Sequence, residues 1–131
     1  MIKWTPEYKM NIPEIDKEHY SLFEKLNEFY QGLEDGSSKE RLGQLIKGLL
    51  DYAKDHFSNE EKYMESIGFP GLDKHREEHE AFIKKASEFY DKYQSGKLIL
   101  SLEVTNFIKE WITHHIKSED KQYAIFAGTA E

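Results

Sequence analysis

The sequence has no cysteine, and it has only three prolines among its 131 residues. The absence of cysteine excludes disulfides, thiolate metal sites, iron–sulfur clusters and cysteine nucleophiles. No apolar run reaches the ~20 residues that span a bilayer, and no apolar stretch of signal-peptide type follows Met1. We therefore expect a cytoplasmic protein without a membrane partner. Acidic residues outnumber basic residues by 25 to 18, which argues against a nucleic-acid partner.

Helix-breaking residues are confined to a few places in the chain. Glycines, with serine or proline beside them, cluster near residues 32–38, 68–71 and 95–96. Between these breaks, apolar residues recur every three or four positions, which is typical of helices that face a shared core. Ser37 and Glu40 have the spacing of a capping box at the start of the second helix. The predicted elements are an extended N-terminal arm over 1–14 and helices over 15–33, 38–67, 72–95 and 101–120 or beyond.

The predicted fold class is all-α, with the whole chain, residues 1–131, in a single domain. Four helices joined by short turns favour antiparallel neighbours, so we expect an up-down-up-down four-helix bundle. Eight Phe, eight Tyr and two Trp supply large side chains for its core. A monomer is the simplest expectation for its oligomeric state.

Polar residues interrupt the predicted core-facing seams of all four helices. Five of the six histidines and one glutamate lie at such positions: His19, His56, Glu60, His75, His79 and His115. In an up-down-up-down bundle, the starts of the first and third helices lie beside the ends of the second and fourth. All six side chains are therefore expected at one level of the core, where buried polar groups need partners.

The spacing of these residues suits metal binding. His56 and Glu60 are four residues apart, as are His75 and His79, so each pair lies on one helix face, one turn apart. Imidazole and carboxylate ligands suit iron, zinc, manganese or nickel. The set exceeds the four ligands of a tetrahedral zinc site, which favours two metal ions. His114 lies ~100° from the seam, so we expect it to be partly exposed or to sit behind a ligand.

Four ordered motifs make the chain similar to a known family. They are Ile15-Asp-Lys-Glu-His19, His56-Phe-Ser-Asn-Glu60-Glu, His75-Arg-Glu-Glu-His79 and Trp111-Ile-Thr-His-His115-Ile-Lys-Ser-Glu-Asp120-Lys. With these motifs, which extend over essentially the whole chain, the sequence resembles the hemerythrin family, specifically its single-domain bacterial members. The resemblance implies reversible O2 binding at a non-haem di-iron centre, with two iron ions joined by an oxo or hydroxo bridge.

The resemblance also implies a role for each motif residue. One iron would be held by His75, His79 and His115, the other by His19 and His56, and both would be bridged by Glu60 and Asp120. Asp120 lies five residues after His115, ~140° away on a regular helix, whereas Glu119 fits the helical spacing better. The resemblance selects Asp120, so we hypothesise a π-bulge that turns this residue inward.

An apolar pocket beside the second iron is a further implication of the resemblance. Its members would be Leu22, Phe57, Trp111, Ile112 and Ile116. Such a pocket would keep water away from the O2 site. Tyr123 matches another position of the family pattern, and we treat it as a candidate neighbour of the ligands.

Several alternatives use the same residues differently. His75, Glu78 and His79 match the H-x-x-E-H motif of a zinc metallopeptidase, although that motif leaves the other seam residues unexplained. A ferritin-like di-iron oxidase needs Glu-x-x-His pairs, which the sequence lacks. The same di-iron site could instead serve O2 or redox sensing, or peroxide or nitric-oxide handling. We expect O2 carriage, storage or delivery without enzymatic turnover. An oxygen-consuming or signalling protein would then be the partner of this chain.

Overall fold

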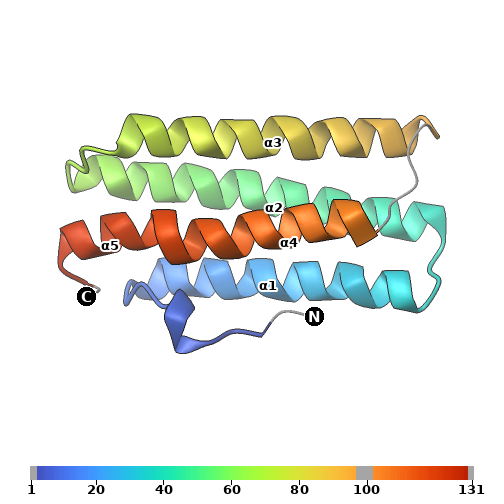
Figure 1. Cartoon of the computed structure of the whole chain (residues 1–131), viewed down its shortest axis with the longest axis horizontal. Helices are drawn as coiled ribbons and strands as arrows, with labels where there is room; N and C mark the ends of the chain where they lie inside the picture. The colour runs from blue at the N-terminus through green and yellow to red at the C-terminus, as the bar shows by residue number, and fades with distance from the viewer. Residues whose placement is uncertain (1–2, 97–101, 130–131) are drawn as a thin grey trace.

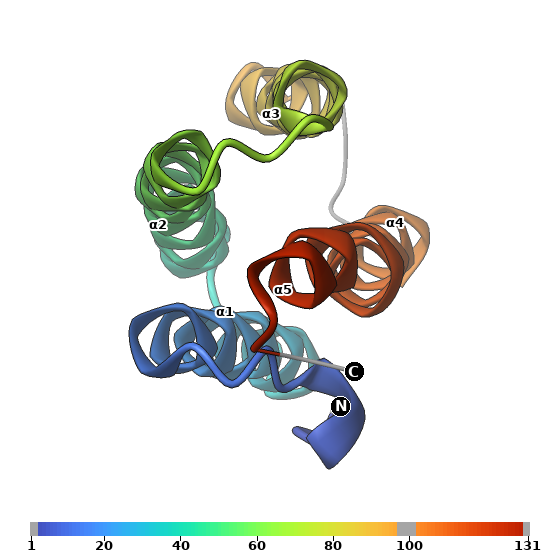
Figure 2. The ribbon, with the colours of Figure 1, turned by 90° about the vertical axis from the view of Figure 1, so that its left-hand side faces the viewer.

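Four antiparallel helical segments form the structure (Figure 1). This computed structural model describes residues 3–96 and 102–129 and, at 102–104, the backbone only. The segments are α1 (Pro13–Glu34), α2 (Lys39–Ser66), α3 (Leu72–Gln94) and a fourth that joins α4 (Leu102–His114), a π-helical turn (His115–Asp120) and α5 (Lys121–Ala127). Seen from one end, they occupy the four corners of a bundle (Figure 2). The predicted all-α, up-down-up-down bundle is confirmed. Within the described ranges, no helix is long and apolar enough to cross a membrane.

The helix boundaries differ from the predictions at a few positions. α1 begins at Pro13, two residues before the predicted start, because proline suits the first helical turn, where its missing N–H is not needed. The arm predicted over 1–14 is therefore shorter, and it is not wholly extended, since Pro6–Tyr8 form a 3-10 turn. The capping prediction was wrong by one residue: Ser38 rather than Ser37 caps α2 with its hydroxyl oxygen. The predicted start of the fourth helix, residue 101, lies outside the described residues.

Two glycines close the helices at the α1–α2 and α2–α3 turns. Gly36 and Gly68 have φ angles of 67° and 68°, in the left-handed region that glycine adopts without a steric penalty. The reversal lets the N–H of Phe69 donate to the carbonyl of Met64 at 3.0 Å, across the end of α2. These tight turns keep sequential helices side by side.

Apolar side chains fill the space between the helices. The largest fully buried ones come from the arm and from every helix: Met10, Leu22, Leu26, Phe29, Leu49, Met64, Phe82, Ile108, Ile116 and Tyr123. Burial of one such side chain is worth about 1.5–3 kcal/mol relative to exposure. The core therefore runs along the bundle and surrounds the polar level that the sequence predicts.

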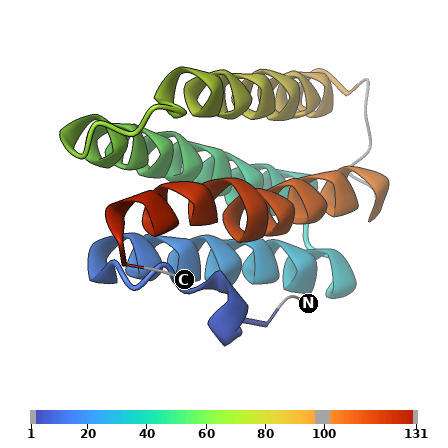
Figure 3. The same cartoon turned by 60° about the vertical axis from the view of Figure 1, so that its left-hand side comes forward.

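The N-terminal arm packs against α1 and lies close to the end of α5 (Figure 3), where Asn11 donates to Thr129. Tyr8 meets Phe23 of α1 edge-on, with 4.7 Å between ring centroids, and Trp4 contacts the same ring at 5.3 Å. Met10 is fully buried, and its N–H donates to Asp16 at 2.7 Å. The arm is thus a packed part of the structure.

We predict opposite effects for the same substitution at two glycines. Gly68→Ala should destabilise the protein by about 1–2 kcal/mol, because alanine is strained at positive φ. Gly48→Ala should stabilise it by about 0.5–1 kcal/mol, because this residue lies inside α2 and alanine is the better helix former. A Cβ at either position would meet nothing within 4 Å, so backbone conformation alone decides the sign. Urea unfolding of both variants measures the difference, and equal shifts would contradict the assigned backbone geometry.

Candidate metal centre

Seven buried polar side chains meet at the end of the bundle that holds the start of α1, the α2–α3 turn and α5. They are His19, His56, Glu60, His75, His79, His115 and Asp120, and each is at most 4% exposed. α1 contributes one of them, α2 and α3 contribute two each, and the π-helical turn contributes the last two. The structure brings together every side chain that the sequence predicted as a ligand.

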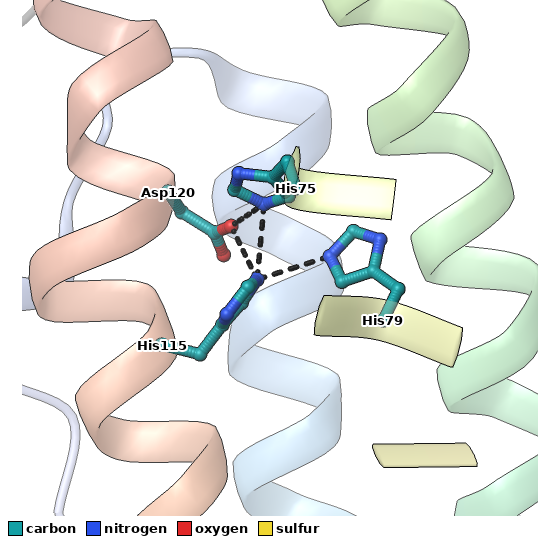
Figure 4. Close-up of side chains that lie close together, drawn as sticks. All are labelled: His75, His79, His115 and Asp120. Carbon is teal, nitrogen blue, oxygen red and sulfur yellow. Dashed lines mark hydrogen bonds and ion pairs between the residues drawn. The ribbon is translucent and has the colours of Figure 1, made fainter. Parts of the chain in front are cut away.

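Three histidines and Asp120 form the first group (Figure 4). The Nε2 atom of His115 lies 3.0 Å from that of His75 and 3.0 Å from that of His79. Asp120 Oδ1 lies 2.7 Å from His75 Nε2 and 3.1 Å from His115 Nε2. All three rings therefore direct the same ring nitrogen toward a common point beside one carboxylate oxygen.

Two histidines and two carboxylates form the second group. His56 Nε2 lies 3.0 Å from Glu60 Oε1, one helical turn away on α2. His19 Nε2 lies 3.4 Å from Glu60 Oε2 and 3.1 Å from Asp120 Oδ2. This group thus has one histidine fewer than the first.

Both buried carboxylates lie between the two groups. Asp120 directs Oδ1 toward His75 and His115 and Oδ2 toward His19. Glu60 Oε1 lies 3.6 Å from His79 of the first group and 3.0 Å from His56 of the second. Each carboxylate can therefore contact ions held by both groups at once.

Asp120 reaches the centre because the last helix has a π-helical turn at the position hypothesised from the sequence. Residues His115–Asp120 form a π-helical turn, in which hydrogen bonds join residues five apart and bring such residues to one face. Asp120 is fully buried, whereas Glu119, which fits a regular helix better, is only half-buried. The hypothesised bulge is present. His114 is exposed, and the structure leaves it outside both groups.

Carboxylates behind two of the histidines fix their orientation. Glu18 Oε1 lies 2.8 Å from His56 Nδ1, and Glu61 Oε2 lies 3.0 Å from His79 Nδ1. Because an ionised carboxylate only accepts hydrogen bonds, each Nδ1 carries the hydrogen and each Nε2 faces the centre. Arg76 in turn donates to Glu61 at 2.9 Å. These partners were not predicted, although Glu18 and Glu61 stand directly beside the predicted His19 and Glu60.

Glu78 does not occupy the position that the metallopeptidase alternative needs. Its Oε2 lies 3.5 Å from His115 Nδ1, on the side of the ring that faces away from the first group. A general base would have to reach the space beside the Nε2 atoms. The geometry therefore places Glu78 behind a histidine.

Tyr123 contacts the centre directly. It is fully buried, and its hydroxyl donates to Glu60 Oε2 at 2.5 Å. Burial and the nearby charge of Glu60 raise the pKa of Tyr123 well above its usual value, so the phenol keeps its proton. Tyr123 therefore holds one oxygen of Glu60 in place.

The electrostatics of the centre keep both carboxylates ionised. Burial opposes ionisation, but His56 and His19 lower the pKa of Glu60, and His115 lowers that of Asp120. Burial likewise lowers the pKa of His56, yet Glu60 and Glu18 outweigh it and raise this pKa to about 10. A dry part of the core thus holds two negative charges, which attract positive charge.

Metal ions fit the unsatisfied atoms of the centre. Five buried atoms of the centre have no hydrogen-bond partner among the described residues: His19 Nδ1 and Nε2, His56 Nε2, Glu60 Oε1 and Asp120 Oδ2. Each group offers four ligand atoms within 4.8 Å of one another. Imidazole nitrogen with carboxylate oxygen is a donor set suited to iron, manganese or zinc. The residues present therefore fit a metal in each group.

Aromatic rings stack on two of the histidines. Phe57 stacks on His79, with centroids 3.9 Å apart and planes at 6°, and Trp111 stacks on His115 at 4.4 Å and 11°. The other predicted pocket residues, Leu22, Ile112 and Ile116, are each 2% exposed, whereas Trp111 is half-buried. Phe57 and Trp111 thus stack on histidines of the first group, whereas the pocket was predicted beside the second ion.

Known proteins share this sequence and fold. A sequence model described as the hemerythrin HHE cation binding domain matches residues 10–125. Bacteriohemerythrin of Clostridium acetobutylicum is 37% identical over 129 residues, with 94% of this chain and 98% of that protein covered. Myohemerythrin of Theromyzon tessulatum is 28% identical, with 92% of this chain and 89% of that protein covered. A crystal structure of wild-type hemerythrin has a TM-score of 0.89 at 26% identity, with 95% of each chain covered. Since the match extends over most of its length, the chain belongs to the hemerythrin family of O2-binding, non-haem iron proteins.

Proposed function

We propose that the chain binds two iron ions and, through them, O2 reversibly, for oxygen carriage, storage or delivery. The first ion would be held by His75, His79 and His115 and the second by His19 and His56, and Glu60 and Asp120 would contact both. The observation that carries the proposal is the position of the two carboxylates, since each lies with its oxygens within 3.6 Å of histidines from both groups. When bound, the iron pair supplies the electrons that reversible O2 binding requires.

Charge balance supports two cations in the centre. Two ionised carboxylates are buried there with five histidines, and a neutral imidazole brings no positive charge. An uncompensated buried charge costs several kcal/mol, so two anions at one level of a core need counter-charges. Metal ions satisfy the charge and also the first group, where His115 Nε2 lies 3.0 Å from the Nε2 atoms of both His75 and His79. Protons on all three of these nitrogens would face one another instead of an acceptor.

The unequal ligand sets support one O2 site. With both carboxylates shared, the first group offers one histidine more than the second. The ion in the second group is therefore the one with room for a further ligand, as a reactive metal site requires an open position. We assign O2 to this position.

The remaining residues have two supporting roles in the proposal. Leu22, Phe57, Trp111, Ile112 and Ile116 exclude water from the O2 site, which protects it from competing reactions. Glu18, Glu61 and Tyr123 hold His56, His79 and Glu60 in their orientations through hydrogen bonds of 2.8, 3.0 and 2.5 Å.

We predict that the purified protein contains two iron ions per chain. After reduction, a visible absorption band should develop on exposure to O2 and disappear under inert gas. Metal analysis and visible spectroscopy through this cycle test both parts. Zinc in place of iron would contradict the proposal. A single irreversible oxidation would replace O2 carriage with peroxide or nitric-oxide handling at the same site.

We predict that His56→Ala binds only one iron ion firmly and loses the reversible O2 band, because the second group then keeps a single histidine. His114→Ala is the matched control, since this histidine is exposed and outside both groups. Iron content and O2-dependent spectra of the two variants are compared with those of the unmodified chain. Reversible oxygenation of His56→Ala would refute the ligand assignment.

We predict that Glu61→Gln lowers iron affinity on the order of tenfold, because the amide is a weaker acceptor for His79 and no longer forms the ion pair with Arg76. Glu65→Gln, at an exposed position one turn further along α2, should leave the affinity unchanged. Competition with a chelator of known affinity gives both values. Equal affinities in the two variants would show that Glu61 does not orient His79.

A further inference from the structure

The π-helical turn needs an explanation for its stability. π-helical hydrogen bonding is rare in proteins, because the regular α-helical pattern is normally preferred. Here the turn begins with His115 and ends with Asp120, so both ends of it enter the metal centre. A change to the α-helical pattern would turn Asp120 ~140° away from His115. Inside the centre, Asp120 is held by His19, His75 and His115, at 3.1, 2.7 and 3.1 Å. A second set of contacts holds the outer face of the turn.

Two lysines connect the outer face of the turn to the N-terminal arm. Lys121, the residue after Asp120, donates from Nζ to the carbonyl oxygens of Glu7 at 3.2 Å and Lys9 at 2.9 Å. Lys117, within the turn, pairs with the carboxylate of Glu7 at 2.9 Å. Its ammonium also lies over the ring of Tyr8, 5.0 Å from the centroid. Every one of these contacts ends on the same short stretch of the arm.

The arm is itself fixed to the rest of the bundle. Tyr8 is 7% exposed and packs on Phe23, and Met10 is fully buried with its N–H on Asp16. On the other side, the amide of Asn11 donates to the carbonyl oxygen of Thr129 at 2.9 Å, just beyond α5. The arm therefore joins α1 to the π-helical turn and to the residue just beyond α5.

We propose that the N-terminal arm is a clasp that holds the π-helical turn in its pattern, with Lys117 and Lys121 as positioning residues for Asp120. A shift to the α-helical pattern would rotate Lys121 by ~100° relative to His115 and remove its ammonium from the carbonyls of the arm. Because the arm is fixed on α1, it cannot follow this rotation. The effect on metal binding rests on the proposed function, but the clasp itself concerns the backbone and can be measured without metal.

The first test is hydrogen exchange of the full-length, metal-free chain. Lys121→Met removes both hydrogen bonds to the arm and keeps the length of the side chain. We expect amides 115–121 to exchange roughly tenfold faster in this variant. Lys47→Met is the matched control, since it removes a lysine whose ion pair with Asp51, 2.9 Å long, lies on the exposed face of α2. Lys121→Arg keeps the donors and should exchange like the unmodified chain.

The second test is the rate at which a chelator removes iron from the loaded protein. Lys121→Met should lose iron roughly tenfold faster than Lys47→Met, at temperatures at which both remain folded. If the unmodified chain holds no iron, the proposed function fails, while the exchange experiment still decides the clasp.

A further variant keeps the proposal falsifiable if Lys121→Met does not fold. Glu7→Gln removes only the ion pair with Lys117 at an exposed position outside α1. It should accelerate exchange of the same amides to a smaller extent. Unchanged exchange of amides 115–121 in folded Lys121→Met and Glu7→Gln, relative to Lys47→Met, would overturn the clasp.

Discussion

The burial of two ionised carboxylates between two groups of histidines is the constraint on which the rest of the structure depends. Glu60 and Asp120 are both fully buried, and neither could keep its charge there without the surrounding rings. The need to supply rings from every side explains why each of the four segments contributes at least one side chain. The outer hydrogen bonds from Glu18, Glu61 and Tyr123 then restrict the ligands to one arrangement.

The fold and most of the buried polar cluster were predictable because both depend on periodicity. A seam with a spacing of three and four indicates the core face of a helix, and antiparallel topology then places residues distant in sequence at one level. His19 and His115 are 96 positions apart, yet topology alone brings them together. Helix ends were less predictable, because Pro13 and Ser38 act through local backbone geometry that the seam does not encode.

Other features could not be predicted from spacing. Asp120 conflicts with helical periodicity, and only the resemblance to a family selected it over Glu119. Glu18 and Glu61 occupy positions that resemble ordinary solvated helix faces, so nothing in the sequence pattern distinguishes them from other glutamates. Their role depends on which ring nitrogen of a neighbouring helix lies within 3.0 Å, which is a property of packing.

The π-helical turn rotates the residues that follow it about the axis of the last helix. On a regular helix, Tyr123 would lie ~80° away from His115, on a different face. One residue of the turn is in effect looped out, so Tyr123 lies only ~20° from that face, where it reaches Glu60. The residues of α5 therefore face different directions from those they would have on a regular continuation of α4. A one-residue deletion between α4 and α5 would rotate all of α5 relative to the centre. The length of this short stretch is thus as firmly constrained as the identity of its histidine and aspartate.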